Sequence, residues 1–226
     1  MIKVLCAINW NCPMIYTTAC FNYFDWYKYY SGHPNIKVDF RRFVEFPYEK
    51  SFIPMINIAI EEGFDFIFTA DPDMSAEARI IEQFIAHDKC LVGALHYGRK
   101  PPHDPQMWDV EMLENGEIDH FWRFSRGAIF NPGHKNRIAG TSLFKTDIRA
   151  GGYNLIKVEA IKQLNPPTPT MYQNYKFKDD YNGWDCDICL RLTKIFGGVY
   201  TDLDTSLNVK HVGFNAIGEV EEQLAT

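Results

Sequence analysis

The chain lacks the features that would point to nucleic acid or a lipid bilayer. It has no basic cluster, because its 23 lysines and arginines are scattered among 29 acidic residues, for a formal net charge of -6. Nucleic-acid binding needs a concentrated basic face, so we expect no nucleic-acid partner. No apolar run approaches the roughly 20 residues that a membrane-spanning helix requires. We therefore expect no transmembrane segment and a cytoplasmic protein.

Cysteines are few and far apart. The chain has six of them in 226 residues, at positions 6, 12, 20, 90, 186 and 189. Their separation and their apolar neighbours favour reduced core thiols over a disulfide framework. Cys186 and Cys189 form a C-x-x-C, but the second cysteine pair of a structural zinc site is missing and the pattern falls in a predicted helix. These cysteines therefore also favour the cytosol.

The chain contains enough hydrophobic residues to form one large core. Hydrophobic residues make up 46% of it and aromatic residues 15%. Strand-like and helix-like segments alternate without internal repeats, which predicts a single α/β domain with a mixed, mostly parallel central sheet flanked by helices. The predicted strands are 2–9, 35–44, 64–69, 90–95, 153–157 and one or two within 199–212, with a hairpin over 110–124; the predicted helices are 13–30, 51–62, 75–87, 159–164 and 184–196.

Two carboxylates directly follow the strand predicted at 64–69. Asp71 and Asp73 flank Pro72 and would lie at the carboxyl edge of the sheet, where α/β proteins hold their ligands. Hard oxygen ligands of this kind suit a divalent cation that carries a phosphorylated substrate. The pair can equally be read as turn formers with a cap for the next helix, which would begin at Ser75.

Two further polar residues and one pair of glycines stand out. Asp185 begins the helix predicted at 184–196, where the helix dipole favours its ionised form, so it can accept a proton or simply cap the helix. His211 stands at the edge of a closing strand, as a metal ligand or as a structural residue. Gly151 and Gly152 would let the backbone approach a ligand closely, or merely turn the chain.

In their order and spacing these motifs resemble those of GT-A fold nucleotide-sugar glycosyltransferases, in particular small viral, phage and bacterial members related to glycosyltransferase family 2. The resemblance covers most of the chain. It implies that Asp71 and Asp73 are the DxD motif, which with His211 holds Mn²⁺ or Mg²⁺, and that Asp185 is the catalytic base of an xED motif. The donor-binding residues that it implies are Ala7, Ile8, Asn9, Asn57, Asp71, Gly151 and Gly152, and the acceptor-binding residues are Trp184 and Tyr153.

The chain departs from the family pattern at two sites. Trp184 replaces the first acid of the usual Glu-Asp pair, and Met55-Ile56 replaces the Ala-Arg that precedes Asn57. The carboxylate expected at 184 is therefore absent, and a contact to the donor phosphate or to the DxD loop is in doubt.

The function implied by the resemblance is metal-dependent, inverting transfer of a hexose. The donor would be a nucleoside-diphosphate sugar, with UDP favoured, and the acceptor a hydroxyl on a glycan or glycoconjugate. Manganese is favoured because imidazole is a softer ligand than oxygen. Residues 1–95 would form the nucleotide-binding half, 96–213 the acceptor and catalytic half, and 214–226 a tail. Because the acid at 184 is missing, a second interpretation stays open: a catalytically degenerate module of the same fold that binds a sugar nucleotide or a glycan.

Overall fold

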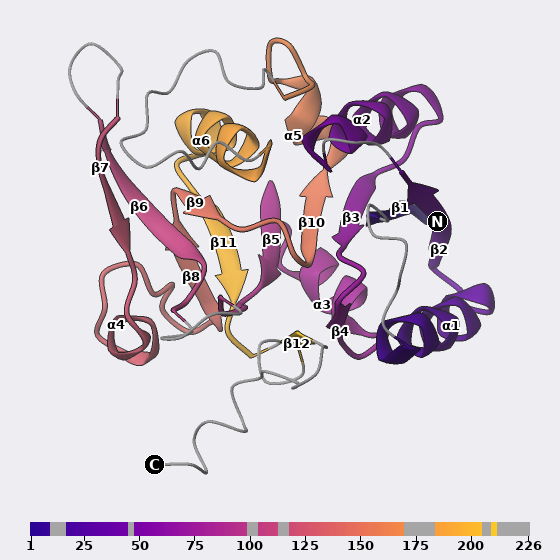
Figure 1. The fold of residues 1–226 in the computed structure, drawn as a ribbon, viewed down its shortest axis with the longest axis horizontal. Helices are drawn as coiled ribbons and strands as arrows, with labels where there is room; N and C mark the ends of the chain where they lie inside the picture. The colour runs from indigo at the N-terminus through magenta and orange to yellow at the C-terminus, as the bar shows by residue number, and fades with distance from the viewer. Residues whose placement is uncertain are drawn as a thin grey trace.

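A seven-stranded mixed sheet forms the centre of the molecule (Figure 1). The computed structural model describes residues 1–9, 17–44, 48–98, 104–112, 118–169, 184–204 and 209–211. In order across the sheet, the strands are β2 (Ile36–Phe43), β1 (Ile2–Asn9), β3 (Phe66–Ala70), β10 (Asn154–Lys157), β5 (Leu91–Ala94), β11 (Val199–Asp202) and β8 (Leu143–Thr146). Only β10 and β8 run antiparallel to their neighbours in it. The predicted α/β class with a mostly parallel sheet is therefore confirmed.

Both faces of the sheet are covered by helices, as parallel strands require. Alternate side chains of β1 enter different cores: Leu5 and Ala7 pack on one face, and Val4 and Cys6 on the other. The first face carries α2 (Phe52–Glu61), α5 (Val158–Lys162) and α6 (Trp184–Phe196), and the second carries α1 (Thr17–Ser31) and α3 (Ile80–Ala86) (Figure 1). A short 3-10 helix, η1 (Tyr48–Ser51), leads into α2. This layering leaves the strand ends as the place where polar residues can gather.

Two small sheets and one short helix complete the described part. They are the three-stranded sheet of β7 (Ile118–Arg123), β6 (Met107–Met112) and β9 (Ile148–Arg149), the pair β4 (Met74–Ser75) and β12 (Lys210–His211), and α4 (Arg126–Phe130). The β6–β7 pair confirms the predicted hairpin, although its turn at residues 113–117 lies outside the described residues. The strands β8 and β9 and the helix α4 were not predicted.

The helix predicted after the carboxylate pair is wrong at its start. Ser75 does not cap it, because Ser75 belongs to β4 and pairs with Lys210 of β12. The following residue, Ala76, exchanges two hydrogen bonds with the side chain of Asn22, and α3 begins only at Ile80. Tertiary partners thus hold this backbone in an extended form that local sequence does not reveal.

The cysteines behave as core residues. Cys6, Cys90, Cys186 and Cys189 are buried free thiols, and burial raises the pKa of Cys6 far above its usual range. Cys12 lies outside the described residues. Within the ranges that the structure describes, no helix combines the length and the apolar character needed to cross a bilayer.

Candidate functional site

The order of the first three strands creates a crevice at the carboxyl end of β1. The chain leaves β1 for β2 on one side and returns to β3 on the other, so the connections after β1 and β3 diverge. Open α/β sheets bind their ligands at such a switch point. Asn9 ends β1, and Ile8 pairs with Ala70, the last residue of β3. The predicted donor residues 7–9 therefore lie beside the strand end that leads into Asp71.

The carboxylate pair itself lies in a turn. The backbone N–H of Met74 donates to the carbonyl of Asp71 at 3.3 Å, and Pro72 takes the second position of the turn, which its fixed φ favours. The Tyr23 hydroxyl donates to the same carbonyl at 2.7 Å. Asp73 is 4% exposed and Asp71 is partly exposed. Asp71 and Asp73 therefore lie in a turn, as one of the two interpretations predicted. The other interpretation, that they are metal ligands, stays open because the contacts that close the turn are made to the backbone.

The segment that carries His211 runs directly beside this turn. In the antiparallel β4–β12 pair, His211 is the partner of Met74, the residue after Asp73. The side chain of His211 is outside the described part of the structure. The backbone pairing alone brings Asp73 and His211, two predicted metal-binding positions, close together although they are far apart in the sequence.

Residues 150–153, here called the glycine loop, connect β9 to β10 and are tied to the end of β3. The Thr69 hydroxyl lies 3.0 Å from the carbonyl oxygens of both Gly151 and Gly152. The Asn154 amide donates to Gly151 at 2.6 Å, and the Asn154 backbone N–H donates to the Thr69 oxygen at 3.2 Å. Since Thr69 is close to Asp71 along the chain, these bonds hold the glycine loop beside the carboxylate turn.

Both glycines of this loop are needed by the protein itself. A Cβ at Gly151 would stand 2.7 Å from Cζ2 of Trp184. A Cβ at Gly152 would stand 2.8 Å from Sδ of Met74 and 2.9 Å from Cε1 of His96. We expected the space over these glycines to admit a donor sugar, whereas in this structure side chains of the chain occupy it. The close approach that glycine permits here is between segments of the protein.

Asp185 is joined to the glycine loop by a direct hydrogen bond. The Gly151 N–H donates to Oδ2 of Asp185 at 2.9 Å, and the Cys186 N–H donates to Oδ1 at 2.9 Å. The carboxylate is 5% exposed, and this burial raises the pKa of Asp185 to about 6; the two N–H donors oppose the rise and the charge of Asp71 adds to it. Three separately predicted motifs therefore meet at one edge of the sheet.

The second acid in the first turn of α6 has a different environment. Asp187 forms an ion pair with Arg191 one helical turn later, at 3.1 Å. Arg191 also donates to the carbonyl oxygen of Thr168 at 3.0 Å. Asp187 is thus part of a structural anchor, while Asp185 faces the glycine loop.

Three residues that were predicted to contact the donor or the acceptor are not placed for that role. Trp184 is 3% exposed and stacks on Phe52, and Tyr153 is fully buried with its ring centroid 5.4 Å from that of Trp26. Both are core rings in this structure, and neither offers a face to an acceptor. Asn57 lies on the exposed face of α2.

Sequence reasoning missed four polar residues that build this edge. They are Thr69, His96, Arg149 and Asn154, all buried. Thr69 and Asn154 carried a usable signal, because a polar residue at the end of an otherwise apolar strand pattern often has a specific partner. His96 and Arg149 carried none, since His96 approaches Gly152 and two of the three hydrogen bonds of Arg149 reach Ala94 and Thr201, all far along the chain.

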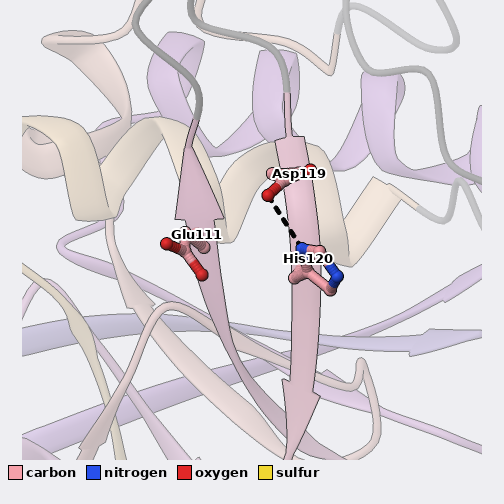
Figure 2. A group of neighbouring side chains, drawn as sticks. All are labelled: Glu111, Asp119 and His120. Atoms are coloured by element: carbon pink, nitrogen blue, oxygen red, sulfur yellow. Dashed lines mark ion pairs between the residues drawn. The ribbon is translucent and has the colours of Figure 1, made fainter.

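A separate acidic group lies on the outer hairpin (Figure 2). Ligand atoms of Glu111, Asp119 and His120 lie within 4.8 Å of one another, and all three residues are exposed. Nδ1 of His120 is 2.9 Å from Asp119, and Glu111 faces His120 across the strands. Exposed groups of this kind are common without a bound ion, and this one does not include the predicted ligands.

Comparison with known proteins supports the fold at low sequence identity. No protein-family model and no curated protein matches the chain. Among solved structures, it is similar to the crystal structure of A197 from STIV, over 94% of this chain and 86% of that chain, with a TM-score of 0.54 and 9% sequence identity. At this identity the likeness concerns the fold alone, an α/β architecture shared along nearly the whole chain.

Proposed function

We propose that this chain is a cytoplasmic, metal-dependent, inverting glycosyltransferase of the GT-A type. It would move a hexose from a nucleoside-diphosphate sugar, preferably a UDP-sugar, to a hydroxyl of a glycan or glycoconjugate. The observation that carries the proposal is the meeting of Asp71, the glycine loop and Asp185 at the carboxyl edge of the sheet, with β12 beside the carboxylate turn. A topological switch point is where such a donor would bind.

The donor set fits a hard or borderline divalent cation. Asp71 and Asp73 supply oxygen ligands from one turn, and His211 belongs to the strand paired beside it. A bound Mn²⁺ or Mg²⁺ would neutralise negative charge on the departing diphosphate. The mixed carboxylate and imidazole set favours manganese.

Asp185 has the properties of a general base. As the acceptor hydroxyl oxygen bonds to the anomeric carbon, the bond from that carbon to the diphosphate oxygen breaks and the hydroxyl proton passes to the Asp185 carboxylate. A pKa of about 6 makes this carboxylate a stronger base than an ordinary aspartate and leaves it mostly ionised at pH 7. Attack opposite the leaving group inverts the anomeric centre. Residues 96–213 would frame the acceptor.

A catalytically degenerate binding module is the second candidate, and one observation favours it. The indole of Trp184 is packed on Phe52 in the core, so no acid takes the place of the missing first carboxylate at that position. Such a module would bind a sugar nucleotide or a glycan without turnover. Transfer or donor hydrolysis by the wild-type protein separates the two candidates.

The test uses two substitutions and one control. Asp73→Ala should abolish Mn²⁺-dependent donor binding in calorimetry. Asp185→Asn should leave donor binding nearly intact and lower the rate of transfer by a factor on the order of 100 or more, because proton removal by a positioned base contributes about that much. Asp119→Asn, which removes a carboxylate of the exposed hairpin group, should change neither.

Each result bears on a separate part of the proposal. Unchanged metal-dependent binding in Asp73→Ala would remove the metal role, and unchanged transfer in Asp185→Asn would remove the base. Donor binding by a wild-type protein that neither transfers nor hydrolyses the sugar would favour the degenerate module.

A further inference from the structure

The centre of the molecule contains a fully buried guanidinium. Arg149, the last residue of β9, is 1% exposed, and burial lowers its pKa to about 10, so it remains protonated at neutral pH. Burying a charge is costly unless hydrogen bonds and opposite charge compensate it. The partners of this group therefore indicate what it holds in place.

Each nitrogen of the guanidinium meets an oxygen from a different segment. Nε donates to the Thr201 hydroxyl of β11 at 3.3 Å, and Nη1 donates to the Tyr153 carbonyl at 3.3 Å. Nη2 donates to the Ala94 carbonyl at the end of β5. A Cβ at Gly93 would lie 1.5 Å from Nη1, so this strand position leaves the space that the guanidinium fills. Arg149 thus joins β9 of the small sheet to two strands of the large sheet and to the end of the glycine loop.

One of these hydrogen bonds and one electrostatic interaction connect Arg149 to the candidate base. The Tyr153 carbonyl ends the glycine loop, and Gly151 in the same loop donates its N–H to Asp185. Burial lowers the pKa of Arg149, and the negative charge of Asp185 opposes this lowering. The glycine loop is therefore fixed at its far end by Arg149 and bonded near its start to Asp185.

We infer that Arg149 is a positioning residue for Asp185, acting through the glycine loop. The inference rests on the proposed function for its catalytic consequence, and on the three hydrogen bonds for its structural part. Removing one charged group from a buried polar network is costly, because the partners that remain are buried without their donor. An apolar side chain in place of the guanidinium could not donate to the Tyr153 and Ala94 carbonyls, so the end of the glycine loop would lose this contact.

The experiment compares four variants of the full chain. Arg149→Met removes the fork, and Arg149→Lys keeps the charge with one donor group in place of three. Thr201→Val removes only the acceptor of Nε and is the milder variant if the Arg149 variants fold poorly. Thr146→Val is the matched control, because Thr146 is a buried threonine on the adjacent strand β8 and its hydroxyl has no hydrogen-bond partner within the described residues. Circular dichroism checks that each variant folds.

Two readouts are expected to change together. Amide hydrogen exchange at 151–153 should accelerate in Arg149→Met and, to a smaller degree, in Thr201→Val, while Thr146→Val matches the wild type. With a nucleotide sugar and Mn²⁺, kcat of Arg149→Met should fall by about 10-fold or more while the donor KM stays within about 2-fold, since a displaced base affects the transition state more than binding. Arg149→Lys should recover part of kcat.

The outcomes separate this inference from the proposed function. Unchanged exchange at 151–153 in a folded Arg149 variant overturns the inference, and so does an unchanged kcat. A wild-type protein that transfers no sugar overturns the proposed function; accelerated exchange at Gly151 in the same variants then still supports the link from Arg149 to the Asp185 hydrogen bond.

Discussion

Asp185 shows how a single buried acid links pH to folding. Its pKa is raised from 3.8 to about 6, with burial as the main cause. An acid whose pKa is higher in the folded state than in the unfolded state stabilises the fold in its protonated form. This contribution is fully present below pH 3.8 and is lost as the pH rises through about 6.

We predict that Asp185→Asn changes the pH dependence of stability in the metal-free protein. Between pH 4 and pH 7, the free energy of unfolding of the wild type should fall by on the order of 2–3 kcal/mol because of Asp185. The variant should lack this decrease, because asparagine does not titrate. Urea denaturation of both proteins at several pH values measures the difference. Asp119→Asn, at an exposed position, should follow the wild-type curve. Parallel curves for wild type and Asp185→Asn would contradict the raised pKa.

The packing of Trp184 over the glycine loop gives a second prediction at this scale. Gly151→Ala should lower the free energy of unfolding by about 1–3 kcal/mol, because its Cβ would meet the indole of Trp184, which is stacked on Phe52 in the core. The same substitution made in a Trp184→Leu background should cost less, which a double-mutant cycle measures. Gly32→Ala is the control, since a Cβ there meets nothing within 4 Å. Equal costs in both backgrounds would contradict the contact.

At the scale of elements, helix α1 supports the strand that follows the carboxylate turn. The Asn22 side-chain amide donates to the Ala76 carbonyl at 2.6 Å, and Oδ1 of Asn22 accepts a hydrogen bond from the Ala76 N–H at 2.9 Å. One side chain thus makes the two backbone hydrogen bonds that a neighbouring strand would make. The indole N–H of Trp26 donates to the same carbonyl at 2.9 Å. These bonds fix the chain just after Asp73.

We predict that Asn22→Ala lowers the free energy of unfolding by about 1–3 kcal/mol, although alanine is the better helix former. It should also weaken Mn²⁺ binding, because the backbone after Asp73 loses its support. Chemical denaturation and calorimetry measure the two effects. Phe21→Ala on the same helix is the control, since Phe21 is 64% exposed and its loss should change stability by less than about 0.5 kcal/mol. A stable variant that binds the metal normally would contradict the role assigned to α1.

Elements with a strong local pattern were predictable, and elements defined by distant partners were not. Apolar runs of strand length predicted β1, β3, β5 and β10, and Gly197-Gly198 marked the end of α6 correctly. The two-residue strands β4 and β9 are defined by pairing with distant segments, so no periodicity in the sequence predicts them, whereas β12 falls within the closing strands predicted at 199–212. The same holds for the site: the acids and glycines were visible as motifs, whereas Arg149 is important only because Gly93, on a distant strand, leaves room for it.

At the scale of the whole molecule, the sheet separates two hydrophobic cores and leaves the candidate site at their common edge. Gly151 and Trp184 lie on the face of α2, α5 and α6, while Met74 and Tyr153 belong to the core under α1 and α3. A ligand at this edge would therefore contact segments anchored in both cores.

We predict that such a ligand stabilises the whole fold. In a thermal-shift screen of nucleotide sugars with Mn²⁺, one donor, a UDP-sugar, should raise Tm by roughly 5 °C or more when present at about 100 times its Kd. The shift should disappear when the metal is removed by a chelator, and it should be absent in Asp73→Ala. A screen in which no nucleotide sugar changes Tm would contradict donor binding.

The pairing of β12 with β4 also has a consequence for biosynthesis. The backbone partner of Met74 is encoded far downstream, near residue 211, so a nascent chain that has produced only the carboxylate turn has an open strand edge there. On the ribosome, the turn and its neighbouring helix can form early, but the edge next to Asp73 closes only after the chain as far as residue 211 has been translated. Under the proposed function, the metal ligands would come together only at that stage.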